Sequence, residues 1–138
     1  MSRVLLDTNV YISAYGFGGR PADIVRAAIL GEFELVTSPA ILTEVADRLA
    51  AVLGFDREHV EEVVRQIARV SVIVRPEAKL GVLSDDADNR ILEAALESDA
   101  KCIVSGDRHL LELGVWEGIA VVRVAEFLDE WDHRPGAA

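Results

Sequence analysis

The chain has 138 residues, 51% of them hydrophobic, and a formal net charge of −10 from 24 acidic and 14 basic residues. This length and composition suit a single globular domain with one hydrophobic core. We expect that domain over residues 1–131, followed by a disordered tail over residues 132–138. The negative charge argues against generic binding to nucleic acid, because Lys and Arg supply most of that affinity by neutralising phosphates.

Cysteine usage and the start of the chain indicate the compartment. Cys102 is the single cysteine, which excludes an intramolecular disulfide and fits a reducing environment. Its place in an apolar run is typical of a small buried hydrophobe. Residues 3–7 enter an apolar run directly with no signal-peptide pattern, and no stretch approaches the roughly 18 apolar residues of a membrane span. We therefore expect a cytoplasmic protein without membrane contact.

In chain order, short apolar segments alternate with longer segments of helical period. The predicted order is β-α-α-β-α-α-β-α-β-α-β-α, with strands near residues 4–6, 34–36, 72–74, 102–104 and 120–122. Strands that alternate with helices indicate a parallel sheet flanked by helices. The expected fold class is therefore α/β: a three-layer α/β/α sandwich with a central, mainly parallel sheet of about five strands.

The middle of the chain predicts two consecutive helices that form an αα-hairpin. Ser38 can cap the first helix, and Pro39 suits its first turn because the missing N–H costs nothing there. Gly54 separates this helix from a second one, which we expect from Asp56 to about Val70. The buried positions predicted from the helical period are Ile41, Val45, Leu49 and Val52 in the first helix and Val60, Val63, Val64 and Ile67 in the second.

Four acidic residues stand where a short apolar run ends or a predicted helix begins: Asp7, Glu44, Asp88 and Asp107. Asp7 and Asp107 follow predicted strands, and in open α/β sheets the ligand crevice lies outside the carboxyl ends of the strands. Carboxylates gathered at one edge repel each other, and a Mg²⁺ or Mn²⁺ ion relieves that repulsion through the oxygen ligands that it prefers. The pattern therefore predicts a divalent-metal site.

For three of these acids a purely structural role is an alternative to a role in the site. Asp7 can cap the helix that follows it, and Asp107 can cap a helix over residues 108–113. Glu44 can form an i,i+4 ion pair with Arg48 on the surface of its helix. For these residues, position alone does not separate the structural role from the functional one.

The start of the helix near residue 86 is crowded with acids. Asp85, Asp86 and Asp88 all lie there, and a single cap together with the helix dipole would account for any one of them. Three acids in four positions exceed what capping requires. Spacing leaves open which of them belongs to the site.

Four segments of the chain, taken in order, resemble the motifs of the PIN-domain ribonucleases. They are Asp7–Val10, Ser38–Glu44, Asp85–Leu92 and Ile103–Leu111. The resemblance runs from Arg3 to about Glu130 and is greatest to the VapC-like toxins of bacterial toxin–antitoxin pairs. Such toxins often have Asp-Pro-x-Asp where this chain has Asp-Asp-Ala-Asp, and this difference leaves the choice between Asp86 and Asp88 open.

The resemblance implies a metal-dependent endoribonuclease that hydrolyses RNA phosphodiester bonds. Asp7, Asp88 and Asp107 would hold one or two Mg²⁺ or Mn²⁺ ions, which polarise the phosphate and activate a water molecule. Glu44 would complete the four catalytic acids by orienting that water or by contributing to a second metal.

Polar and basic residues complete the expected site. Asn9 and Ser105 would orient the carboxylates through hydrogen bonds. Arg20, Arg90 and Arg108 are candidates for binding the phosphates of the substrate, because the planar guanidinium suits phosphate. The alternative for each arginine is a solvated or ion-paired place on the surface.

The resemblance also implies partners. Besides the RNA substrate, we expect a small antitoxin protein and self-association into a homodimer. A tail of the antitoxin could place an Arg or Lys among the four acids instead of the metal, because the same carboxylates attract any cation.

Other functions compete with this interpretation. A phosphotransferase of the haloacid dehalogenase type needs a second acid two residues after the first, where this chain has Asn9. A receiver domain needs an acidic pair at its first strand end and a lysine near its last strand, and the chain supplies neither. Two alternatives remain: a PIN fold that binds RNA or a partner without cleaving, and a stand-alone RNA-processing nuclease. The presence of all four acids favours an enzyme.

Overall fold

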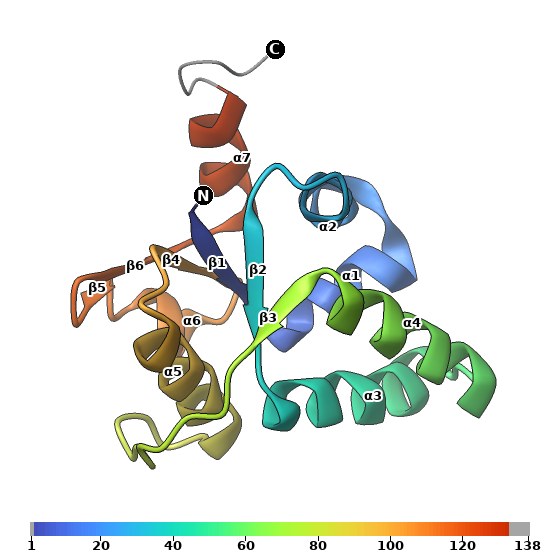
Figure 1. The fold of residues 1–138 in the computed structure, drawn as a ribbon, viewed down its shortest axis with the longest axis horizontal. Helices are drawn as coiled ribbons and strands as arrows, with labels where there is room; N and C mark the ends of the chain where they lie inside the picture. The colour runs from blue at the N-terminus through green and yellow to red at the C-terminus, as the bar shows by residue number, and fades with distance from the viewer. Residues whose placement is uncertain (1, 133–138) are drawn as a thin grey trace.

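The computed structural model of the protein describes residues 2–132, except for the side chain of Asp132. Within that range, six strands and seven helices follow one another (Figure 1). The strands are β1 (Arg3–Leu6), β2 (Glu34–Thr37), β3 (Ser71–Ile73), β4 (Cys102–Val104), β5 (Val115–Trp116) and β6 (Ile119–Val122). The helices are α1 (Thr8–Phe17), α2 (Gly19–Ile29), α3 (Pro39–Leu53), α4 (Arg57–Arg69), α5 (Asp86–Ser98), α6 (Arg108–Leu111) and α7 (Val124–Asp132).

The described strands form one sheet in the order β3-β2-β1-β4-β6-β5. Neighbouring strands are parallel except β5 and β6, which are antiparallel. This arrangement confirms the predicted α/β class with a mainly parallel sheet flanked by helices. The prediction missed β5, which is only two residues long. A tight turn joins it to β6, and both turn residues, Glu117 (φ 51°) and Gly118 (φ 78°), have the positive φ that two-residue hairpin loops require.

The central strands β2, β1 and β4 each have an apolar, buried core because helices cover both of their faces. Leu5, Leu35 and Ile103 are fully buried, one in each strand. In Figure 1, helices α1, α2 and α4 lie on one side of these strands and α5 lies on the other. At one end of the sheet α7 packs near α2, and the ring of its Phe127 meets that of Phe33 edge-on at 5.2 Å.

Helices α3 and α4 form the predicted αα-hairpin. The hydroxyl of Ser38 accepts the N–H of Ile41 at 3.3 Å and caps α3, as expected. Gly54 ends α3 in the left-handed conformation with φ 68°, which a glycine adopts at little cost. The carboxylate of Asp56 caps α4 by accepting the N–H of His59 at 2.8 Å.

The buried stripes of this hairpin are narrower than predicted. Ile41, Val45 and Leu49 are buried in α3, but Val52 is 53% exposed, so that part of the prediction is wrong. Val52 lies in the last turn of α3, just before Gly54 ends the helix. In α4, Val63 and Ile67 are buried whereas Val60 and Val64 are only partly buried.

The register of the sheet determines which residues meet at its carboxyl edge. Leu5 of β1 is paired with Val36 of β2, and Leu6 is paired with Val104 of β4. From β1 the chain continues to β2 and β3 on one side and later returns to β4 and β6 on the other. The edge beside β1 and β4 is therefore the topological switch point, where α/β sheets bind their ligands.

At the end of the described chain, α7 continues through Asp132. The rest of the predicted disordered tail, residues 133–138, lies outside the described residues. None of the described helices has the length and apolar character needed to cross a membrane.

Candidate functional site

Asp7 and Ser105 follow the two central strands and contact each other at the switch point. The Ser105 hydroxyl donates a hydrogen bond to Oδ2 of Asp7 at 2.8 Å, and it accepts the backbone N–H of Asp107 at 2.9 Å. Both side chains are buried, with Asp7 5% exposed. Through these two hydrogen bonds Ser105 orients Asp7 and holds the turn that carries Asp107.

Asp107 caps α6, as its structural interpretation predicted. Its Oδ1 accepts the backbone N–H groups of His109 at 2.7 Å and Leu110 at 3.3 Å. The helix itself is shorter than expected, since it ends at Leu111. Because both capping bonds use Oδ1, capping is compatible with a ligand on Oδ2.

Asp7 does not cap the helix that follows it in the same way. It occupies the N-cap position of α1, yet its side chain makes no capping hydrogen bond there. The hydrogen bond from Ser105 instead turns one carboxylate oxygen toward β4. The cap interpretation of Asp7 therefore does not explain why its carboxylate is buried.

The three acids at the start of α5 have distinct surroundings. Asp85 is the cap, because Oδ1 of its carboxylate accepts the N–H of Ala87 at 2.9 Å. Asp86 is exposed and receives a 3.4 Å hydrogen bond from the side-chain amide of Asn89. Asp88 is only 6% exposed, and its Oδ2 is buried without a hydrogen-bond partner. A buried acceptor of this kind is costly unless a water molecule, an ion or another ligand satisfies it.

The electrostatic environment of Asp88 shows that the four predicted acids lie together. Burial is the largest cause that raises the pKa of Asp88, to about 6, and the negative charges of Asp107, Asp85, Asp7 and Glu44 contribute to this rise in that order. Such coupling requires the acids of β1, α3, α5 and the β4–α6 turn to share one region. The structure thus brings together the acids that lie up to 100 residues apart in sequence.

Asp7 and Glu44 respond to the same crowding. Burial raises the pKa of Asp7, and the hydrogen bond from Ser105 opposes this rise. Burial also raises the pKa of Glu44, and the charge of Asp7 adds to it, whereas Arg48 and a hydrogen bond with the Thr8 side chain act in the opposite direction. The ionised cluster is therefore destabilised by its own charge, as expected for carboxylates that await a cation.

The donors of this cluster suit a hard divalent cation, although they are not arranged around one. Asp7, Glu44, Asp88 and Asp107 offer only carboxylate oxygens, which are the ligands that Mg²⁺ and Mn²⁺ prefer, and the unpartnered Oδ2 of Asp88 is an acceptor available to an ion. Over residues 2–132, no group of three His, Cys, Asp or Glu side chains has the spacing of a formed metal site.

The predicted arginines are already engaged in ion pairs. Arg90 contacts Glu93 at 2.8 Å and the backbone oxygen of Leu80 at 3.3 Å. Arg108 pairs with Glu112 at 3.6 Å, and Arg20 pairs with Asp129 at 3.0 Å. The last two pairs are exposed, so each costs little to break. Asn9, the other predicted supporting residue, is exposed.

Two neighbours of the site were not predicted to be part of it. Thr8 is buried beside Asp7 and contributes the hydrogen bond to Glu44. Arg48 lies close enough to influence both Asp7 and Glu44, yet it is absent from the ion pairs found among the described residues. The Asp-Thr sequence after a strand and the i,i+4 spacing of Glu44 and Arg48 were the available signals for both.

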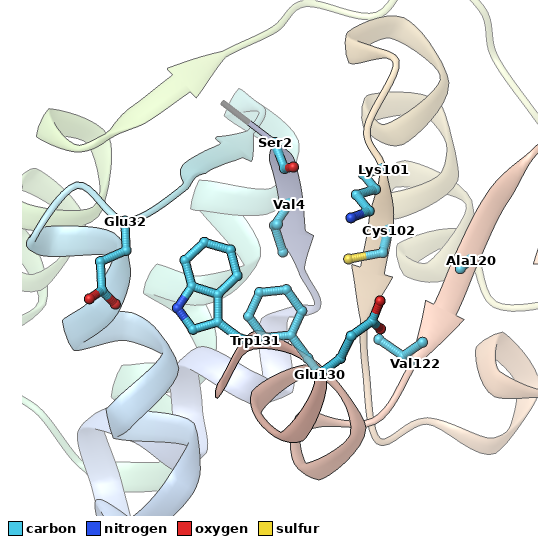
Figure 2. Close-up of a pocket in the computed structure, with 10 residues that line it drawn as sticks. Ser2, Val4, Glu32, Lys101, Cys102, Ala120, Val122, Glu130 and Trp131 are labelled. Atoms are coloured by element: carbon cyan, nitrogen blue, oxygen red, sulfur yellow. The ribbon is translucent and has the colours of Figure 1, made fainter. Parts of the chain in front are cut away.

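A pocket between α7 and the sheet is separate from the acids. It lies beside β1, β4 and β6, with Val4, Cys102, Val122 and Trp131 among its lining residues (Figure 2). None of the four acids lines it. Cys102 is buried there, and burial raises the pKa of its thiol to about 11, which agrees with an inert small hydrophobe.

Comparison with known proteins assigns the chain to a family. A family model described as the PIN domain matches residues 3–109. The uncharacterized protein MJ1680 of Methanocaldococcus jannaschii is 32% identical over 120 residues, which cover 80% of this chain and 74% of that protein.

Two solved structures share the fold. A chain in the crystal structure of VapBC2 from Rickettsia felis, bound to a DNA fragment from its promoter, has a TM-score of 0.64 at 12% identity and covers 88% of this chain and 98% of its own. PAE2754 from Pyrobaculum aerophilum has a TM-score of 0.64 at 16% identity, with 97% and 91% covered. At these identities the likeness is one of fold alone. Because the family model spans most of the sequence, the chain belongs to the PIN domain family.

Proposed function

We propose that the protein is a metal-dependent endoribonuclease that hydrolyses RNA phosphodiester bonds at the carboxyl edge of β1 and β4. The observation that carries this proposal is the coupled cluster of Asp7, Glu44, Asp88 and Asp107, in which Oδ2 of Asp88 is buried without a partner. Membership of the PIN domain family supports it, because PIN domains are in general nucleases. RNA as the substrate rests on the resemblance of the four motifs to the PIN ribonucleases.

In this proposal Asp7, Asp88 and Asp107 hold one or two Mg²⁺ or Mn²⁺ ions. The bound cation supplies positive charge that offsets both the carboxylates and the approaching phosphate. Ser105 fixes the orientation of Asp7 through its 2.8 Å hydrogen bond, as groups behind metal ligands commonly do. Glu44, at the border of the cluster, orients the water that attacks phosphorus.

We propose further that the protein acts as the toxin of a toxin–antitoxin pair and forms a homodimer. The VapC-like motifs support this role, and so does the shared fold with a chain of the VapBC2 complex. An antitoxin side chain that carries positive charge would bind the same acids that repel one another in the free protein. The acidic cluster would thus bind either the metal or the positively charged side chain of the antitoxin.

The proposed activity is tested with purified protein and labelled RNA in the presence of Mg²⁺ or Mn²⁺. Asp7→Asn should lower the cleavage rate by orders of magnitude, because the variant loses a ligand charge while its shape is kept. Asp47→Asn is the matched control, since Asp47 is exposed on α3 and the change in net charge is the same. Equal cleavage by both variants, or cleavage that survives removal of the metal with EDTA, would overturn the proposal.

A further inference from the structure

Arg48 stands apart from the other arginines around the site. It lies on α3 one turn after Glu44, so both side chains project from the same side of the helix. Arg48 is partly buried, and its Nε is buried without a hydrogen-bond partner. The ion pairs within residues 2–132 include Arg20, Arg90 and Arg108, and none of them involves Arg48.

A partly buried arginine without an ion pair needs another source of stabilisation. The guanidinium stays charged in any protein environment, and burial of an uncompensated charge is unfavourable. The positive charge of Arg48 reaches two carboxyls of the site, since it lowers the pKa of both Asp7 and Glu44. The arginine and the two acids thus stabilise one another without direct contact.

We infer that Arg48 is a positioning residue of the acidic site: it is the resident counter-cation whose charge offsets the negative charges of Asp7 and Glu44 before a divalent ion binds. The expected effect of Arg48 on metal binding rests on the proposed function, whereas its stabilisation of the ionised acids does not. The charge of Arg48 is not among the influences on the pKa of Asp88. Arg48 therefore acts on the β1 and α3 side of the site.

This role has two consequences of opposite direction. Without Arg48, the carboxylates of the metal-free protein repel each other more strongly, so the fold should become less stable. The same change removes a positive charge near the metal position, so Mg²⁺ should bind more tightly. If Arg48 only packed against its neighbours, its removal would instead lower both the stability of the fold and the affinity for Mg²⁺.

The first experiment is a double-mutant cycle in the metal-free protein, with Arg48→Gln, Glu44→Gln and the double variant. We expect Arg48→Gln to lower the melting temperature of the parent. The same substitution should lower the melting temperature of the Glu44→Gln variant clearly less, because the two residues are coupled. Arg48→Lys should retain most of the parent stability, since it keeps the charge. Arg65→Gln, an exposed arginine of α4, is the charge-matched control and should show no coupling to Glu44→Gln. Additive effects of Arg48→Gln and Glu44→Gln would overturn the inference.

The second experiment is a calorimetric titration of the same proteins with Mg²⁺. We expect Arg48→Gln to bind Mg²⁺ about 3- to 10-fold more tightly than the parent, as a nearby unit charge predicts, while Arg48→Lys and Arg65→Gln stay close to the parent. Weaker binding by Arg48→Gln would contradict the inference. If no protein binds Mg²⁺ but the cycle shows coupling, the proposed metal-dependent function fails while the role of Arg48 as counter-cation stands.

Discussion

The hydroxyl of Ser105 donates a 2.8 Å hydrogen bond to Oδ2 of Asp7 across 98 residues of sequence, and at the same time it accepts the backbone N–H of Asp107. One small side chain thus links two of the proposed metal ligands. It sits where β1 and β4 end side by side, so the sheet register itself brings this bond about.

Ser105→Ala should impair both stability and activity. The substitution leaves the Asp107 N–H and one Asp7 oxygen without their partner, which costs about 1 to 3 kcal/mol of unfolding free energy. Cleavage of RNA should fall about 10- to 100-fold, as is common when a group behind a metal ligand is lost. Urea unfolding and the cleavage rate are the two measurements.

The control for Ser105→Ala is Ser98→Ala. Ser98 is also buried, and its hydroxyl donates to the backbone oxygen of Ala95 at 3.2 Å, within α5. The Ser98→Ala variant should be less stable than the parent, while its cleavage rate stays near that of the parent. If the two variants lost activity to the same extent, the bond to Asp7 would have no special role in the site.

Asp88→Asn should change how the stability of the metal-free protein depends on pH. The pKa of Asp88 is raised from 3.8 to about 6 in the fold, so the native state holds this proton more firmly than the unfolded chain does. The unfolding free energy of the parent should therefore fall as the pH rises from about 4 through about 6, by up to about 3 kcal/mol. Denaturant unfolding at several pH values measures this dependence.

In the Asp88→Asn variant that decline should be smaller. Near pH 7.5 and without metal, the variant should be more stable than the parent by about 1 to 2 kcal/mol, because a buried charge among other carboxylates is removed. Near pH 4 the difference should disappear. A variant that is less stable than the parent at pH 7.5 would show that the Asp88 carboxylate supports the fold instead of straining it.

Ser38→Ala should destabilise the helix that carries Glu44. Ser38 caps α3 through a 3.3 Å hydrogen bond from the N–H of Ile41, and loss of such a cap costs about 1 kcal/mol. Ser38→Thr keeps a hydroxyl and should recover most of that loss. Thermal melting compares the three proteins, and equal melting temperatures for the parent and Ser38→Ala would contradict the capping role.

If a small gene adjoins the gene of this protein, co-expression with its product, followed by size-exclusion chromatography and an RNA cleavage assay, tests the proposed antitoxin. Co-elution with loss of cleavage is expected, because a cation of the partner would occupy the acidic cluster. Independent elution with undiminished cleavage would exclude that neighbour as the inhibitor and favour a stand-alone RNA-processing nuclease. The elution volume of the free protein tests the expected homodimer.

Sequence patterns predicted the elements of this fold better than their arrangement. The apolar runs placed five strands within a residue or two, because the strands of a parallel sheet covered by helices are rich in apolar residues. The order of the strands was not predicted, since it depends on contacts between distant segments. The two-residue strand β5 was missed as well, although Glu117 and Gly118 are the kind of pair that makes a tight hairpin turn.

The residues of the site, like the strand order, could be predicted from the sequence only in part. Strand ends indicated Asp7 and Asp107, but spacing could not separate Asp86 from Asp88. The helical period of α5 contained a usable signal, because Asp88 shares the face of Leu92 and Ala95, which are fully buried. The bond between Ser105 and Asp7, and the unpaired state of Arg48, depend on side-chain geometry that no sequence pattern specifies.

Asp88 is a proposed ligand of the catalytic metal, and its exposed neighbour Asp86 offers the sharpest comparison. The decisive measurement is the rate of RNA cleavage in Mg²⁺ by Asp88→Asn and by Asp86→Asn, two variants with the same charge change on the same turn of α5. We predict a loss of several orders of magnitude for Asp88→Asn and nearly full activity for Asp86→Asn. Equal activity of the two variants, or loss of activity in Asp86→Asn alone, would contradict the site proposed for this protein.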